Sequence, residues 1–239
     1  MIGRPKIRIL GLWILGMLAM STPEILGYEA VNVQNGGSIT GTVTFVGTLP
    51  VGMLVTISKD QEICGKTEKK DETLIVGPNR GIQNVVVSLV DIKRGKRFTT
   101  KDVVLDQKEC RYAPHVLLVP AGGTVTILNN DGILHNLHSY SSKNPPFNKA
   151  QPKFKKSIKE TFREPEIVKL TCDAHAWMIG WLVIHEHPYY AITDSAGGFL
   201  LSDVPPGEYN IKVWHESLGE KVTPVNVPSQ GKVVFNSDF

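Results

Sequence analysis

One short stretch of the chain places three side chains that bind soft metals at every third position. Cys172, His175 and Met178 follow one another in Cys-Asp-Ala-His-Ala-Trp-Met. A thiolate and a thioether with imidazole suit copper, and two histidines, one cysteine and a weak axial methionine are typical of an electron-transfer copper site. The loop lacks one histidine of that set, and residues 129–138 upstream supply two candidates, His135 and His138. The pattern therefore predicts a site for one copper ion.

Three other interpretations of Cys172 remain open. A single cysteine is most often a small buried hydrophobic residue, but here His and Met follow it at a fixed spacing. Zinc is a rival metal, although Met178 is an unusual neighbour for zinc and four strong ligands are not visible. An enzyme would use Cys172 as a nucleophile and His175 as its base, but the sequence supplies no third orienting group. We therefore favour copper and expect no enzymatic activity.

The elements that must position these residues are strands. With 22 glycines, 15 prolines and short runs rich in valine and threonine, the composition predicts an all-β protein. We expect 85–90 to be a strand buried on both faces, because the run is continuously apolar. The segment 141–152, rich in Ser, Asn, Pro and Lys, is expected to be a surface excursion. The other expected strands are 38–46, 103–105, 116–119, 124–129, 157–162, 167–172, 181–184 and 209–214.

His135 and His138 cannot both point at one metal from a regular strand, because an odd separation places them on opposite faces. A β-bulge between them would reverse this assignment, so His138 stays the reserve ligand. Asn136 is expected either to brace the site by a hydrogen bond to the cysteine loop or to be an ordinary turn residue. The remaining histidines are expected to be packed or surface residues; they are His115, His185, His187 and His215.

Three motifs together resemble a cupredoxin over residues 103–185. They are Gly-Thr-Val-Thr-Ile-Leu-Asn-Asn-Asp at 123–131, His-Asn-Leu-His at 135–138 and the Cys-x-x-His-x-x-Met loop at 172–178. The short loop and the His-Asn-x-His pattern are most similar to amicyanin, as in exported cupredoxins of the methylamine-utilization type. The resemblance implies a Greek-key sandwich, which we place at 97–187, and it selects His135 as the second histidine ligand. Cupredoxins of this kind usually have proline where this chain has Ala176, so we expect His175 to be less firmly held.

The C-terminal part of the chain changes character. Residues 190–199, Tyr-Ala-Ile-Thr-Asp-Ser-Ala-Gly-Gly-Phe, and 204–209, Val-Pro-Pro-Gly-Glu-Tyr, resemble a carboxypeptidase regulatory-like domain. This resemblance implies a second, small prealbumin-like β-sandwich at 188–239. Domains of that kind usually begin with strands like those at 37–92. Two arrangements therefore remain open: a discontinuous sandwich made of 37–92 and 188–239 with the cupredoxin inserted, or two consecutive sandwiches.

The N-terminus predicts export. Arg4, Lys6 and Arg8 precede a short apolar run, the layout of a signal peptide, which we place at 1–21. An uncleaved anchor is the alternative. Cleavage removes three basic residues and no acid, leaving 23 basic residues against 23 acidic ones, which argues against a globally basic nucleic-acid binder.

In an oxidising compartment an odd cysteine count leaves one thiol over. If Cys172 binds metal, Cys64 and Cys110 are the natural pair; two unpaired thiols are the alternative.

The resemblance implies a periplasmic or extracellular protein that carries single electrons between redox proteins, without a small-molecule substrate, and with His175 as the exit for the electron. Two alternatives are a copper-binding or assembly module without redox turnover and a purely structural sandwich. A lysine-rich segment that contains no acidic residue is usually a solvated surface, but it also suits an acidic docking patch on a partner. These lysines are Lys143, Lys149, Lys153, Lys155, Lys156 and Lys159.

Overall fold

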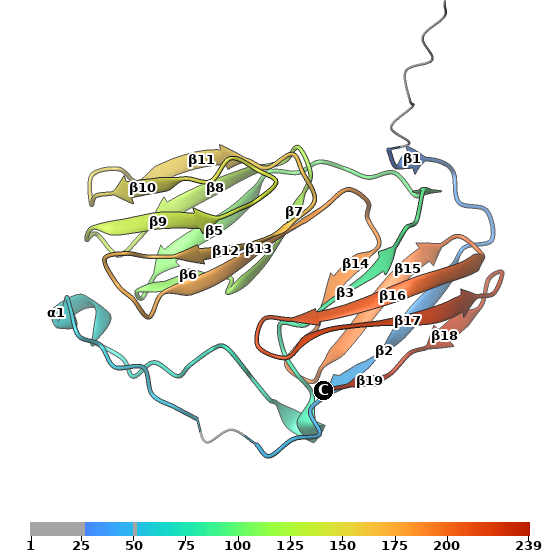
Figure 1. The fold of residues 1–239 in the computed structure, drawn as a ribbon, viewed down its shortest axis with the longest axis horizontal. Helices are drawn as coiled ribbons and strands as arrows, with labels where there is room; N and C mark the ends of the chain where they lie inside the picture. Colours follow the sequence, from blue (N-terminus) through green and yellow to red (C-terminus); the bar gives the residue numbers. More distant parts are fainter. Residues whose placement is uncertain (1–26, 50–51) are drawn as a thin grey trace, which may run out of the picture.

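The computed structural model describes residues 27–49 and 52–239, and this part of the chain is all-β apart from two short helices (Figure 1). The predicted signal peptide at 1–21 lies outside the described residues. Among the residues described, no helix has the length and apolar character needed to cross a membrane.

The first sandwich contains two sheets. One sheet has the strand order β10-β9-β12-β13-β7 and the other β11-β8-β5-β6. The bounds of these strands are β5 Val103–Lys108, β6 Arg111–Ala113, β7 Val116–Pro120, β8 Thr124–Asn129, β9 His135–Tyr140, β10 Asn148–Gln151, β11 Ser157–Thr161, β12 Ile167–Thr171 and β13 Ile179–His185. Their inward side chains, such as Leu105, Ile127, Leu137 and Leu170, form one buried core.

The second sandwich combines strands from both ends of the chain. One sheet has the order β14-β3-β16-β17, and in the other β15, β18 and β19 all pair with β2. The bounds are β2 Gly37–Thr44, β3 Val86–Val90, β14 Tyr190–Ile192, β15 Gly198–Val204, β16 Gly207–His215, β17 Gly219–Val227, β18 Lys232–Val234 and β19 Ser237–Asp238. Strands from 37–92 and from 188–239 thus share both sheets and one core. A further short pair joins β1 Glu29–Ala30 to β4 Arg94–Gly95.

A third apolar cluster joins the two sandwiches. Val86 of β3 packs there with Val116 of β7 and Val183 of β13, and Trp181 meets Trp214 edge to face with ring centroids 5.4 Å apart. The indole nitrogen of Trp181 also donates to Glu216 over 2.8 Å. This second packing surface explains why β3 is apolar on both faces, and the prediction of a strand buried on both faces is confirmed.

Between β2 and β3 the chain leaves the second sandwich, reaches the end of the first one, and returns (Figure 1). We call residues 53–72 the cover segment. It is a hairpin-like excursion, because Val55 N donates to Lys69 O over 2.7 Å and Asp71 N to Met53 O over 2.9 Å. Its tip carries helix α1, Gln61–Cys64. The other short helix, η1 Pro78–Arg80, lies on the return path.

The structure contains every strand that the sequence predicts, with shifts of a few residues at the ends. The segment 141–152 is a correction. It was expected to be a surface excursion, but its last residues form the edge strand β10, which pairs with β9 so that Gln151 lies opposite His135. The polar composition is typical of an edge strand, since only Gln151 of its four residues is buried.

Candidate metal centre

Strand β9 places His135 inside the first sandwich. Its side chains alternate between buried and partly exposed positions, so that His135 and Leu137 point into the core. His138 lies on the other face, as the alternation predicts. There its ring stacks on Tyr140, and its Nδ1 lies 3.1 Å from a carboxylate oxygen of Asp173.

The loop between β12 and β13 folds back on itself through three backbone hydrogen bonds. His175 N donates to Cys172 O over 3.1 Å, Met178 N donates to His175 O over 2.9 Å, and Cys172 N donates to Met178 O over 3.2 Å. Each of these bonds joins the backbones of two of the three predicted ligand residues. All three side chains are buried as a result.

The two segments bring Cys172 and the two histidines together. The Nδ1 atoms of His135 and His175 are 3.1 Å apart, and the Cys172 Sγ lies 3.9 Å from the first and 3.6 Å from the second. The point equidistant from these three atoms lies about 2.1 Å from each, which matches metal–nitrogen and metal–sulfur bond lengths of about 2.0–2.3 Å. The spacing therefore fits a single metal ion bound by one sulfur and two imidazole nitrogens.

Each histidine is held at its outer nitrogen by a carboxylate. His135 Nε2 lies 2.8 Å from Asp131 Oδ2, and His175 Nε2 lies 2.9 Å from Asp60 Oδ2. A carboxylate at one ring nitrogen fixes the tautomer and the ring orientation, which directs the other nitrogen at the metal. In both rings that other nitrogen is Nδ1, and both Nδ1 atoms face the centre of the cluster.

The thiol sulfur has its own partner. Asn136 N donates to Cys172 Sγ over 3.3 Å, and Asp173 N donates to the Asn136 side-chain oxygen over 3.0 Å. The prediction that Asn136 braces the cysteine loop is therefore confirmed. The bond from Asn136 N stabilises a negative sulfur, as metal binding requires.

The surroundings shift the ionisation of the site toward charged groups. Burial raises the pKa of Cys172, but hydrogen bonds from His135, His175 and the backbone outweigh it and lower the pKa to about 6. Burial lowers the pKa of His135, but its hydrogen bonds to Asp131 and Cys172 prevail and raise the pKa to about 9. Both shifts favour the ionised form of Cys172, which is the form that binds a metal.

Met178 completes the loop, and its side chain lies in the same buried cluster as Cys172. The other histidines lie outside the group of ligand atoms found within the described residues; they are His115, His138, His185, His187 and His215. Cys110 also lies close to Asp131 and His135, but its sulfur is bonded to Cys64. The predicted Cys64–Cys110 disulfide is thus confirmed, and Cys172 is the free cysteine among the three.

The expectation that the electron leaves through His175 is not supported by the structure. The ring is fully buried, because the cover segment lies over the end of the sandwich where the ligand loop emerges (Figure 1).

Sequence reasoning missed both Asp60 and Asp131. The sequence could have suggested Asp131 as a partner of His135, because it lies only four residues before it. No local pattern marks Asp60.

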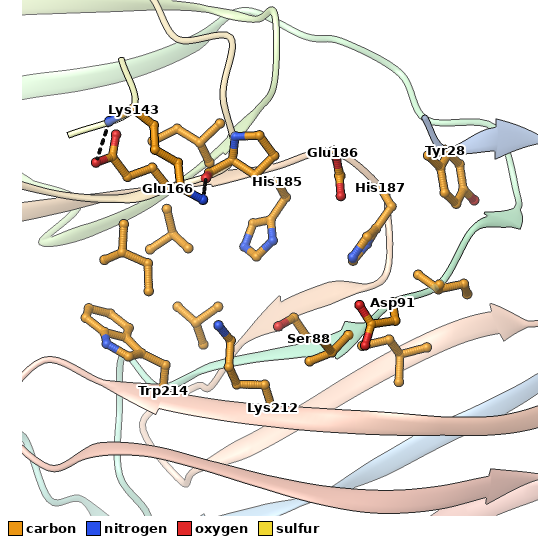
Figure 2. Close-up of a pocket in the computed structure, with 18 of the residues that line it drawn as sticks. Tyr28, Ser88, Asp91, Lys143, Glu166, His185, Glu186, His187, Lys212 and Trp214 are labelled. Atoms are coloured by element: carbon orange, nitrogen blue, oxygen red, sulfur yellow. Dashed lines mark hydrogen bonds between the residues drawn. The ribbon is translucent and has the colours of Figure 1, made fainter. Parts of the chain in front are cut away.

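A cavity of about 450 Å³ is lined by residues of both sandwiches, some of which Figure 2 shows. His185 and His187 reach it from the end of β13 and the residues that follow, and Lys212 and Trp214 reach it from β16. Burial and the neighbouring His187 lower the pKa of His185 to about 3, so its ring is neutral. No predicted copper ligand lines this cavity.

No protein-family model and no curated protein sequence matches the chain. Among solved structures, it is similar to a copper-containing nitrite reductase from Thermus scotoductus, with 22% identity, a TM-score of 0.34 and 39% of this chain covered. The chain spans only 24% of that enzyme's length. It is also similar to a purple cupredoxin from Nitrosopumilus maritimus, with 24% identity, a TM-score of 0.31 and coverage of 35% of this chain and all of that one. For an amicyanin from Paracoccus versutus the identity is 22%, the TM-score is 0.31, and the coverage is 35% of this chain and 81% of that one.

Proposed function

We propose that this chain is an exported protein that holds one copper ion in a type 1 site and carries single electrons between redox partners. One observation carries the proposal. The Nδ1 atoms of His135 and His175 and the Sγ of Cys172 form a triangle whose centre is about one metal–ligand bond length from all three.

The four residues have separate tasks. Copper supplies reversible exchange of one electron when it is bound by this kind of donor set. Cys172 would bind copper as a thiolate together with His135 and His175, and Met178 would be a weak ligand whose strength helps to set the reduction potential. The carboxylates and Asn136 hold these side chains in one arrangement, which favours a site that keeps its geometry when the electron arrives or leaves.

The burial of the site favours a carrier over an enzyme. His135, Cys172 and His175 are all buried, and catalytic metal sites keep a ligand position open for water or substrate. Within the described residues these three side chains are at most 1% exposed. This is the basis for proposing electron transfer without chemistry on an organic substrate.

A second candidate is a copper-binding module without redox turnover. The cover over His175 favours it, because a closed histidine edge retains a metal ion but lengthens the path to a redox partner. Reversible cycling between the two copper oxidation states supports the carrier. A protein that keeps only Cu(I) and passes it to an acceptor is instead a module.

The domain division is also a proposal. We assign the copper site to residues 97–187 and a discontinuous second sandwich to 37–92 and 188–239, because strands of both segments share its sheets. The Cys64–Cys110 disulfide supports an oxidising, periplasmic or extracellular location.

The proposed partner is a redox protein with an acidic docking patch. Between β10 and β11 the chain exposes Phe154, which is 81% accessible, with Lys153, Lys155 and Lys156 around it. An exposed aromatic residue among lysines suits a partner that offers carboxylates around an apolar spot. The turn follows Gln151, which lies opposite His135 in the sheet, so it is close to one ligand strand.

A visible spectrum of the Cu(II)-loaded mature protein tests the proposal. We expect an intense thiolate-to-copper charge-transfer band that Cys172→Ser abolishes. A wild-type protein without the band, or a Cys172→Ser variant that keeps all of it, contradicts the assigned site.

A further inference from the structure

The cover segment supplies a contact to the metal centre from far away in the sequence. Asp60 Oδ2 lies 2.9 Å from His175 Nε2, across 115 positions of the chain. The side chain of His175 is 0% exposed and that of Asp60 is 37% exposed. The ligand histidine is therefore shielded by an acidic residue whose own outer side meets solvent.

Local structure does not explain the conformation of Asp60. It is the N-cap residue of α1, a position where aspartate usually accepts hydrogen bonds from the first helical N–H groups. Here the side chain makes no such bond, and the backbone has a left-handed φ of 49°. A positive φ is uncommon outside glycine, although aspartate adopts it more readily than most residues. The carboxylate is directed at His175 instead of at its own helix.

Several bonds hold the cover segment against the first sandwich. Cys64 is joined to Cys110, and Ile57 and Ile63 pack on the core. Arg111 of β6 pairs with Glu72 over 2.9 Å and donates to Lys70 O over 2.9 Å, and inside the segment Lys69 Nζ donates to Cys64 O. Contacts before and after α1 therefore hold Asp60 in place against the first sandwich.

The Cys64–Cys110 disulfide also connects the cover segment to the surroundings of the other ligand histidine, His135. Cys110 N and Glu109 N donate to Asp131 over 2.8 Å and 2.6 Å, and Asp131 in turn contacts His135 Nε2. Each ligand histidine therefore has one carboxylate at Nε2. The disulfide joins the segment that carries Asp60 to the turn that orients Asp131.

We propose that Asp60 is a positioning residue of the copper site: it holds the Nε2–H of His175, so that Nδ1 faces the metal, and the cover segment excludes water from this edge. The inference rests on the proposed function. Removing the hydrogen-bond partner of a ligand histidine typically weakens metal binding 10–100-fold.

The test compares Asp60→Ala, Asp60→Asn and the matched control Glu62→Ala. Glu62 is an exposed carboxylate on α1, so its removal changes the charge of the cover segment without touching the site. Cu(I) affinity is measured by competition with a chromogenic chelator. We expect about a 10–100-fold loss for Asp60→Ala, a smaller loss for Asp60→Asn, which keeps an acceptor oxygen, and no change for Glu62→Ala.

A second measurement on the metal-free proteins reports on His175 directly. Nitrogen-15 NMR should show its ring as the Nε2–H tautomer in the wild type and in Asp60→Asn, with that preference lost in Asp60→Ala. Unchanged affinity and an unchanged tautomer in Asp60→Ala overturn the inference, as does an equal loss of affinity in Glu62→Ala.

The two proposals fail in different ways. If the wild type binds no copper but Asp60→Ala still abolishes the tautomer preference, the copper function is wrong and the positioning of His175 stands. If the wild type shows the charge-transfer band and Asp60→Ala matches it in both measurements, the copper function stands and the role of Asp60 is wrong.

Discussion

Breaking the Cys64–Cys110 bond should destabilise the protein mainly through the unfolded state. The bond closes a loop with a sequence separation of 46 residues. In the chain-entropy description, a cross-link of this loop length stabilises the fold by about 4 kcal/mol. The loop contains the whole cover segment beyond α1, the strand β3 and the strand β5, so its closure restricts a large part of the unfolded chain.

The assay is urea unfolding of the metal-free protein followed by tryptophan fluorescence. With a urea dependence of ~2 kcal/mol per molar, a loss of about 4 kcal/mol lowers the unfolding midpoint by about 2 M. Two forms are compared with the oxidised wild type: the Cys64→Ala/Cys110→Ala double variant and the wild type reduced by a phosphine. The reduced wild type is the control for packing, because it keeps both sulfur atoms and lacks only the bond.

Similar shifts in both forms support the cross-link as the source of stability. A large shift in the double variant with none in the reduced protein shows that the buried sulfur atoms, and not the bond, carry the stability. Midpoints within about 0.3 M of the oxidised wild type in both forms refute the loop-closure argument.

Of three further predictions, two concern the site and one concerns Glu166, which binds the residues that follow β9. His135→Ala should lose the charge-transfer band while His138→Ala keeps it, as visible spectra of both copper-loaded variants will show; the opposite result means that His138 is the ligand. Met178→Leu should keep the colour and raise the reduction potential measured by voltammetry, because a weak donor to Cu(II) is removed; an unchanged potential argues against an axial role. Burial raises the pKa of Glu166, but hydrogen bonds from Ser141, Ser142 and Asn144 outweigh it and hold that pKa well below its usual value. The stability from this ionised group is present above about pH 4.5 and is lost as the pH falls further, so the melting temperature of Glu166→Gln should lie below that of the wild type at pH 6 and approach it at pH 3; a constant difference contradicts this assignment.

The strands that carry the ligands were predictable because their patterns are local. Alternation of buried and exposed residues placed His135 and His138 on opposite faces, and the every-third-residue spacing of the loop placed Cys172 beside His175. The disulfide followed from the odd number of cysteines once Cys172 was assigned to the metal.

The surroundings of the site were not predictable in the same way. Asp60 reaches His175 from an irregular, charged segment, and no periodicity marks a contact made across 115 positions. Ala176 stands where cupredoxins of this kind usually have proline, which suggested that His175 is loosely held. In the structure the carboxylate of Asp60, far away in the sequence, holds the His175 ring. Strand β10 was missed because an edge strand with one buried side chain has too little apolar alternation to be recognised.

The most direct test of the central claim is a stepwise redox titration of the copper-loaded mature protein, followed by the thiolate-to-copper band. The account predicts that one electron per protein removes the band, that one equivalent of oxidant restores it, and that repeated cycles leave its intensity unchanged. A band that does not return, or copper that leaves the protein when the band is lost, contradicts an electron carrier built on His135, Cys172, His175 and Met178.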